Sequence, residues 1–121
     1  LRRKDFSKDR QLTPVSGSNI NLILNKATSY IAANIREPLR ISHISHICGV
    51  SESGLYKIFS SVLGISPKEY VQDCKMKYAS RLLRETNMTV TQVAREMGFA
   101  NPNHFSNAFF KVTGKRPSSF K

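Results

Sequence analysis

A seven-residue pattern is written twice in this chain, at residues 44–50 and again at residues 93–99. Each copy is an apolar stretch that runs into a glycine-containing turn, and four landmarks follow it in a fixed order. The landmarks are Leu55, Phe59, Gly64 and Pro67 after the first copy, and Phe105, Phe109, Gly114 and Pro117 after the second. The offset is 49 residues up to the first glycine and 50 residues beyond it, so one residue is inserted in the second turn. A short helix, a turn and a second helix form the outline of a helix-turn-helix, and the duplication predicts two of them.

The balance of charge favours a nucleic-acid partner. The 121 residues include 19 Lys and Arg against 8 Asp and Glu, a formal net charge of +11. Nucleic acid is the commoner partner of such a basic chain, and an anionic membrane surface is the alternative. A membrane-surface helix would need its basic residues on one amphipathic segment, whereas here they are scattered. With 40% hydrophobic residues the chain can bury a core, so a plain basic domain without such a partner is the remaining interpretation.

The sequence contains no sign of catalysis or of a cofactor. It has no nucleophile–base set, carboxylate pair or phosphate-binding loop. Cys48 and Cys74 lie on apolar helical stripes without CxxC spacing, which favours structural roles in a reducing cytoplasm. A metal site at His104 is not expected, because His43 and His46 belong to the other repeat and no carboxylate or cysteine completes a set. We therefore expect a protein that is not an enzyme and holds no metal and no cofactor.

The first residues differ in character from the rest. Residues 1–17 carry five basic and two acidic residues and little apolar periodicity, which predicts a basic linker or arm. Because the first residue is Leu1 and not Met, we expect a fragment of a longer protein with a domain upstream of the arm. No apolar run is long enough to span a bilayer, and no signal-peptide pattern opens the chain.

Apolar periodicity predicts an all-helical domain over residues 18–121. The first helix is expected from Ser18 to about Arg36, because Pro38 disfavours helical angles in the residue before it. The further elements expected are a helix-turn-helix over about 41–63, a central helix over about 67–85, a second helix-turn-helix over about 90–113, and a short final turn that brings Phe120 back onto the core.

Capping residues mark most of the expected helix starts. The candidates are Ser51 and Asn101 before the second helix of each repeat, and the capping boxes Ser66 with Glu69 and Thr89 with Gln92. Arg40 stands where the second repeat has Thr89, so Ser42 is the expected substitute cap for the first repeat.

The second helix of the first repeat has a predicted inward stripe and one weak point. The stripe consists of Leu55, Ile58, Phe59, Val62 and Leu63. Gly54 lies near the start of this helix and costs about 1 kcal/mol relative to alanine. We expect this helix to be loose until DNA orders it.

Together, these residues resemble the DNA-binding domain of the AraC/XylS family of bacterial transcription regulators, over about residues 20–121. The matching positions of the first half are Gly49-Val50-Ser51, Leu55, Phe59, Gly64, Ser66-Pro67, Tyr70 and Arg81-Leu82-Leu83. Those of the second half are Val93-Ala94, Gly98-Phe99, Phe105-Ser106, Phe109-Phe110-Lys111, Thr113-Gly114 and Pro117. The resemblance implies about seven helices, in two helix-turn-helix subdomains joined by a long central helix. It also implies a regulatory or dimerisation domain upstream.

Outward residues near the start of each second helix are the expected base readers, because a helix-turn-helix places this end in the major groove. Helical spacing and the resemblance select the same positions in the first repeat. The candidates are Ser53, Tyr56 and Lys57 in the first repeat, and Asn103, His104 and Asn107 in the second. A lysine can donate to guanine O6 and N7, and an asparagine amide can pair with adenine.

Five further residues are expected to contact phosphate. Ser51 and Asn101 lie at helix starts, where backbone amides attract anions. Lys111, Arg40 and Arg36 are cationic candidates, for each of which simple solvation is the alternative.

The central helix sets the expected geometry of binding. About eighteen residues at about 1.5 Å each make a rod of about 27 Å, while successive major grooves on one face are about 34 Å apart. One monomer is therefore expected to read an asymmetric site, with either a tilt of its helices or a bend in the DNA.

These observations predict a sequence-specific DNA-binding transcription regulator, and the resemblance adds the role of an activator. The expected partners are double-stranded promoter DNA and RNA polymerase, with no membrane, in the bacterial cytoplasm at the nucleoid. We expect the fragment to be monomeric and the full protein to be able to dimerise through the missing domain. The alternatives are a non-specific architectural DNA binder and a helical protein-interaction module. The polar variety of the outward residues argues against the first alternative.

Overall fold

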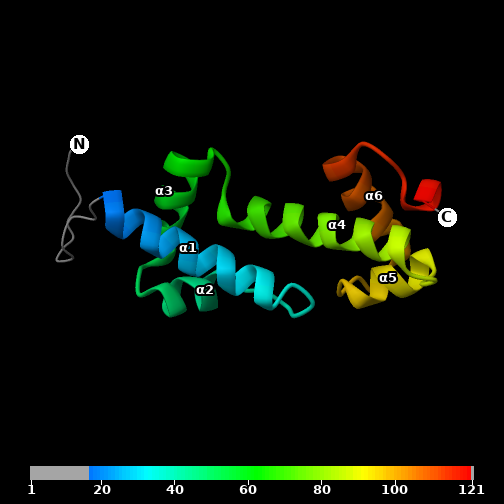
Figure 1. Cartoon of the computed structure of the whole chain (residues 1–121), viewed down its shortest axis with the longest axis horizontal. Coiled ribbons are helices and arrows are strands. Elements are labelled where there is room, and N and C mark those ends of the chain that lie inside the picture. Colours follow the sequence, from blue (N-terminus) through cyan, green and yellow to red (C-terminus); the bar gives the residue numbers. More distant parts are fainter. Residues whose placement is uncertain (1–16, 121) are drawn as a thin grey trace.

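A computed structural model gives the structure of residues 17–120. These residues form six α-helices and one short 3-10 helix, with no strand among them (Figure 1). The elements are α1 (Gly17–Ala33), α2 (Ile41–Cys48), α3 (Glu52–Leu63), α4 (Pro67–Glu85), α5 (Val90–Glu96), α6 (Pro102–Thr113) and η1 (Pro117–Phe120). The predicted all-helical fold with two helix-turn-helix units is confirmed. The basic arm expected over residues 1–17 lies, apart from Gly17, outside the described residues.

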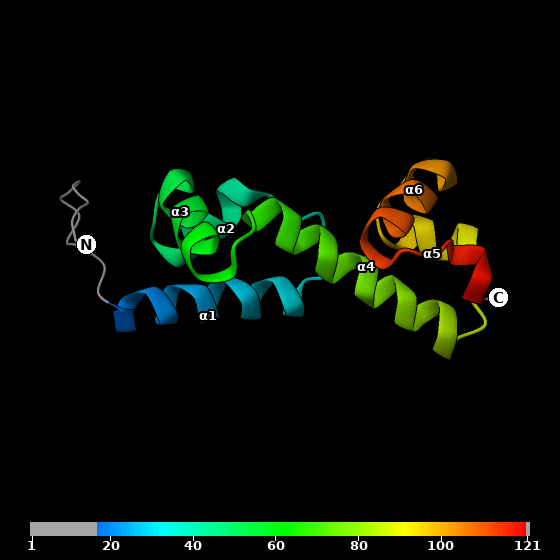
Figure 2. The same ribbon diagram turned by 90° about the horizontal axis from the view of Figure 1, so that it is seen from above.

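Helix α4 joins two small subdomains, each with its own core. Helices α1, α2 and α3 pack with the first part of α4, while α5, α6 and η1 pack with its second part (Figures 1 and 2). The large, fully buried side chains include Ile31, Ile44, Leu55 and Phe59 in the first core, and Met76, Leu83, Phe105 and Phe109 in the second. Because α4 contributes to both cores, its length sets how far apart the two subdomains lie.

The helix starts follow the predicted capping residues. Ser66 and Thr89 form capping boxes, and Ser51 and Asn101 accept hydrogen bonds from the backbone amides of the helices they precede. Each side-chain oxygen satisfies an amide that has no partner within the helix. These short-range signals explain why α3, α4, α5 and α6 begin where the sequence predicts.

The start of α2 and the end of α1 differ from the predictions. Arg40 is the N-cap residue of α2 and makes no side-chain cap hydrogen bond; Ser42, the expected substitute, lies inside the helix. Helix α1 ends at Ala33 rather than near Arg36. The side chain of Asn34 donates to the carbonyl of Tyr30 and the backbone amide of Glu37 donates to the carbonyl of Asn34, so a turn replaces the last helical residues before Pro38.

The predicted inward stripe of α3 was wrong at its end. Leu55, Ile58 and Phe59 are buried, but Val62 and Leu63 are 46% and 40% exposed. They occupy the last turn before Gly64, which adopts a left-handed conformation (φ 74°) and reverses the chain toward α4. This turn extends beyond the packed part of the subdomain, and therefore periodicity alone overestimates the buried stripe.

Candidate nucleic-acid interface

The second helices of the two helix-turn-helix units are α3 and α6, and they are called the recognition helices below because a helix-turn-helix places its second helix in the major groove. They lie near opposite ends of α4, and both lie above it in the view of Figure 1. The first helices of the units, α2 and α5, pack against α3 and α6 respectively. One continuous body therefore carries both helices, joined through α4.

The outward face of α3 carries the three candidates expected there. Ser53, Tyr56 and Lys57 are exposed, while Leu55 between them is fully buried. Ser51 holds the start of the helix by accepting from the amide of Gly54 at 3.0 Å, and its hydroxyl lies 3.3 Å from that of Ser53. These contacts fix the first turn and orient the short Ser53 side chain.

Tyr56 also borders a hollow at the junction of three helices. The hollow lies between the starts of α2, α3 and α4, and its polar rim includes Glu52, Lys68 and Gln72. Tyr56 thus stands both on the outward face of α3 and at the edge of this hollow.

The exposed side chains on the outward face of α6 that were expected to read bases are polar and short. Asn103, His104 and Asn107 are exposed, whereas Phe105 and Phe109 are fully buried and pack against each other with their ring centroids 5.6 Å apart. Asn101 accepts from the amide of Asn103 at 2.8 Å and so closes the helix start. The second unit thus presents two amides and one imidazole over its buried phenylalanines.

Sequence reasoning missed Arg116, which folds back over α6. Its guanidinium donates to the side-chain oxygens of Asn107 at 3.2 Å and Ser106 at 3.4 Å, and lies 4.6 Å from the centroid of the half-exposed Phe110 ring. Ser106 and Asn107 precede Phe110 by four and three residues, so each of them neighbours Phe110 on the helix surface. An exposed phenylalanine on that face, followed by an arginine beyond the helix end, is the signal that could have indicated the contact.

The expected phosphate contacts fall into different environments. Ser51 and Asn101 serve as N-caps, so their side-chain oxygens are already engaged. At α6 the first residue is Pro102, which has no amide hydrogen, and the amides of Asn103, His104 and Phe105 all donate to Asn101. What both helix starts offer an anion is therefore the positive end of the helix dipole. Lys111 is exposed in the last turn of α6, and Arg40 is exposed before α2.

Arg36 is placed apart from the recognition helices. Its Nε lies 3.0 Å from Oε2 of Glu96 at the end of α5, and its guanidinium carbon lies 5.5 Å from the centroid of the Tyr78 ring on α4. Sequence reasoning did not anticipate this pairing, because 60 residues separate the partners. The contact spans the two subdomains.

The two thiols are free and belong to the first core. Cys48 is buried and Cys74 is half-buried. Burial raises the pKa of both thiols, and for Cys74 a hydrogen bond with Tyr70 opposes that rise. Within residues 17–120 no group of three or more His, Cys, Asp or Glu could hold a metal ion, and no helix of that part is long and apolar enough to cross a membrane.

Comparison with known proteins identifies similar chains. A helix-turn-helix domain family matches residues 44–121. The Msm operon regulatory protein of Streptococcus mutans is 31% identical over 106 residues, which cover 88% of this chain and 38% of that protein. The lactose operon transcription activator of Staphylococcus xylosus is 32% identical over 92 residues, which cover 76% and 33%. The chain therefore spans less than half the length of either relative.

The fold has a similar solved counterpart. The crystal structure of a transcriptional regulator from Chromobacterium violaceum, of the group of proteins containing an AraC-type DNA-binding domain, superimposes with a TM-score of 0.80 at 29% identity. The match covers 86% of this chain and 93% of that one. It includes both helix-turn-helix units, since a single unit would cover far less of the chain.

Proposed function

Because the chain belongs to the AraC-type family of helix-turn-helix DNA-binding transcription regulators, we propose that α3 and α6 enter successive major grooves on one face of a promoter site. The observation that carries this proposal is the position of the two recognition helices, on one side of α4 and near its two ends (Figure 1). One monomer would then read two short blocks of bases, and no symmetry of the site is required.

The length of α4 implies a deformation of the complex. Its 19 residues correspond to about 28 Å at about 1.5 Å per residue, less than the roughly 34 Å between successive major grooves. Either the recognition helices tilt or the DNA bends toward the protein. A bend over a site of this size costs of order 1–6 kcal/mol, which the contacts of the second unit would have to offset.

The base contacts are proposed from the exposed residues of both helices. Ser53, Tyr56 and Lys57 would read the first block; Asn103, His104 and Asn107 would read the second. Lys57 suits guanine, and Asn107 suits adenine. The bond from Arg116 leaves both amide hydrogens and one lone pair of Asn107 available, so pairing with adenine remains compatible with it.

The phosphate contacts are proposed at the edges of the same surface. Ser51 and Asn101 mark the starts of α3 and α6, where the partial positive charge of the helix dipole favours an anion. Lys111 and Arg40 would add cationic contacts. Arg36 is not included in this set, because its guanidinium is engaged by Glu96.

At the level of the whole protein we propose an activator of transcription that works in the bacterial cytoplasm at the nucleoid, through contact with RNA polymerase and without catalysis by this domain. The name of the Staphylococcus xylosus relative, a transcription activator, supports this role. The test is transcription by purified bacterial RNA polymerase from a promoter that carries the selected site. Increased transcript supports activation, and decreased transcript would make the protein a repressor.

The first experiment is selection of binding sites from a random pool of duplex DNA, by the 121-residue chain, over a salt series. We expect two short blocks about one helical turn apart. Lys57→Gln should relax only the first block and Asn107→Ala only the second. Lys26→Gln on α1, which removes an exposed lysine outside both helix-turn-helix units, should leave both blocks intact. A flat sequence profile with a steep salt dependence would show that charge alone drives binding.

A further inference from the structure

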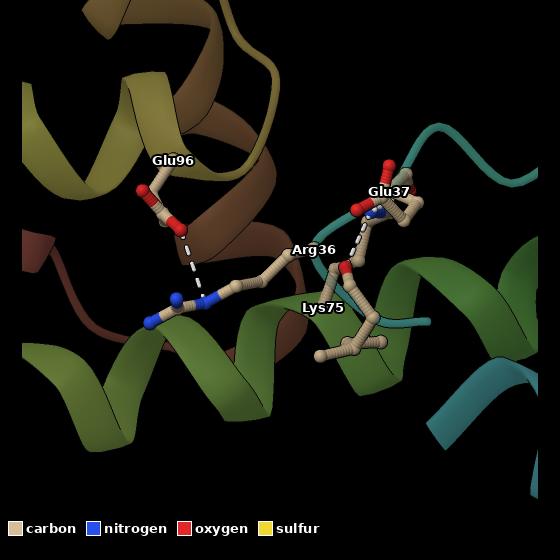
Figure 3. Close-up of polar contacts among 5 residues, drawn as sticks. Arg36, Glu37, Lys75 and Glu96 are labelled. Atoms are coloured by element: carbon tan, nitrogen blue, oxygen red, sulfur yellow. Dashed lines mark hydrogen bonds and ion pairs between the residues drawn. The ribbon is translucent and has the colours of Figure 1, made fainter. Parts of the chain in front are cut away.

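The segment between α1 and α2 lies against the second half of the molecule as well as the first. Residues 34–37 form the turn that follows α1, and they pass beside the middle of α4 (Figure 3). The ends of this turn are fixed by Asn34, whose side chain donates to Tyr30, and by Pro38. The segment is therefore held in place by local structure before any long-range contact is counted.

Lys75 fastens this segment to α4. Its ammonium donates to the carbonyl oxygen of Ile35 at 2.7 Å and to that of Glu37 at 2.9 Å, as Figure 3 shows. Both acceptors are backbone atoms that follow the end of a helix and have no partner in it. One side chain of the central helix thus satisfies two carbonyls of the first subdomain and fixes the residue between them, Arg36.

Arg36 extends from this clamped segment to the second subdomain. The ion pair with Glu96 reaches the last residue of α5, directly before the turn that leads to the recognition helix α6. The ring of Tyr78, on α4, lies beside the guanidinium. The Arg36, Lys75 and Glu96 side chains, called the interdomain bridge below, therefore connect the first subdomain, α4 and the second helix-turn-helix.

The position of the two cores shows why such a connection matters. The contribution of α4 to the first core ends near Cys74, and its contribution to the second core begins at Met76. Without a further contact, only this stretch of α4 would set the angle between the two subdomains. Helices of this length bend. A contact beside the helix, at the same level, resists that bending.

We propose that the interdomain bridge fixes the angle between the two helix-turn-helix units and thereby selects the spacing between the two blocks of the DNA site. Arg36, Lys75 and Glu96 are positioning residues in this proposal, since none of them needs to touch a base. The expected effect on the spacing of the DNA site rests on the proposed function, in which both recognition helices enter the DNA. The expected effect on the orientation of the two subdomains is independent of that function.

The test measures orientation without DNA and spacing with DNA, on the 121-residue chain. Amide residual dipolar couplings are measured for helices α2 and α3 and for α5 and α6. Affinities are measured for sites whose two blocks are one base pair closer, at the selected spacing, or one base pair further apart. The variants are Glu96→Gln, Arg36→Gln and the charge exchange Arg36→Glu with Glu96→Arg. The matched control is Arg81→Gln, which breaks the Arg81–Glu85 ion pair within α4, whose charged atoms lie 3.8 Å apart.

We expect one alignment tensor to fit both units in the unsubstituted chain and in the control. Glu96→Gln and Arg36→Gln should require two tensors of different magnitude, and the charge exchange should restore one. The preference for the selected spacing should fall about two- to fivefold in the single variants, the range expected of a half-exposed ion pair. Thermal stability should change little, which separates orientation from folding.

A single tensor in both single variants would overturn the proposal, and so would split tensors with an unchanged spacing preference. If the unsubstituted chain selects no two-block site, the proposed function fails. The dipolar couplings then decide on their own whether the bridge fixes the subdomains.

Discussion

Arg116 donates a hydrogen bond to the side-chain oxygen of Asn107, with 3.2 Å between Nη1 and Oδ1. The donor lies beyond the end of α6 and the acceptor lies on its outward face. An amide side chain has two orientations that exchange its oxygen and its nitrogen. This hydrogen bond favours the orientation in which the Asn107 oxygen meets Arg116 and both amide hydrogens remain available. A residue outside α6 therefore favours one orientation of Asn107, a side chain that we propose reads a base.

Replacing Arg116 should weaken recognition of the second block specifically. Arg116→Ala removes a hydrogen bond of about 0.5–1.5 kcal/mol and frees Asn107 to rotate. We expect a loss of affinity of that size on DNA with an intact second block, and little loss on DNA in which that block is scrambled. Equilibrium binding of both proteins to the two duplexes measures this loss of affinity. Lys115→Ala, the removal of the neighbouring exposed charge, is the control. An equal loss on both duplexes would instead assign Arg116 to a phosphate contact.

Gly54→Ala should stabilise the chain by less than the full difference in helix propensity. Alanine gains about 1 kcal/mol over glycine inside a helix, but its Cβ would lie 3.2 Å from Oγ of Ser51. Ser51→Ala should cost about 1 kcal/mol through the lost cap. In the double variant the crowding disappears, so the gain from alanine should be larger there than in the single variant. Urea unfolding of the four proteins tests this coupling, and additive effects would contradict it.

The buried and the exposed residues of the α3 stripe should differ sharply in their effect on stability. Phe59 is fully buried in the first core, so Phe59→Ala should cost about 3–5 kcal/mol. Val62 is 46% exposed, so Val62→Ser should change the free energy of unfolding by no more than about 0.5 kcal/mol. Thermal unfolding followed by circular dichroism gives both values. A large effect of Val62→Ser would mean that the last turn of α3 packs against another part of the protein.

The stability contributed by Lys75 should increase with pH. Burial lowers the pKa of Lys75 below the ordinary lysine value, and the nearby Glu37 carboxylate partly opposes this shift. The unfolded chain then binds the proton more tightly than the folded one, so the free energy of unfolding rises with pH between the lowered pKa and about 10.4, the ordinary value. Lys75→Met lacks this pH-dependent contribution to the free energy of unfolding. The difference in unfolding free energy between the two proteins should therefore move in favour of Lys75 as pH rises through this window.

Urea midpoints at several pH values from about 8 to about 10.4 measure this difference. Lys68→Met, which removes an exposed lysine near the start of α4, is the control and should show no such trend. A pH-independent difference for Lys75→Met would contradict the lowered pKa.

Local signals explain the part of the fold that could be predicted. The caps at Ser51, Ser66, Thr89 and Asn101 act on amides two or three residues away, so a few neighbouring letters suffice to place them. The same reasoning failed at Arg40, where the structure has no side-chain cap to find. It also failed at Val62 and Leu63, because their exposure depends on where the neighbouring helices end.

The outward positions of the candidate interface were predictable for a similar reason. Once Leu55 and Phe105 are assigned to the core, the helical period places Lys57 and Asn107 on the opposite face. Helical periodicity could not predict which residue each outward side chain contacts. Asn107 meets an arginine that the chain brings back after a left-handed glycine, Gly114.

The sequence by itself determined the helices, most of their caps, the duplicated helix-turn-helix and the family, because each of these depends on residues close together in the chain. Only the tertiary structure decided that Arg36 pairs with Glu96 and that Lys75 holds the segment between α1 and α2. Those contacts join residues 38 to 60 positions apart, and they exist only once both subdomains are set on α4. A pattern along the chain records which face of a helix is apolar, but the angle between two packed units arises from all their contacts together.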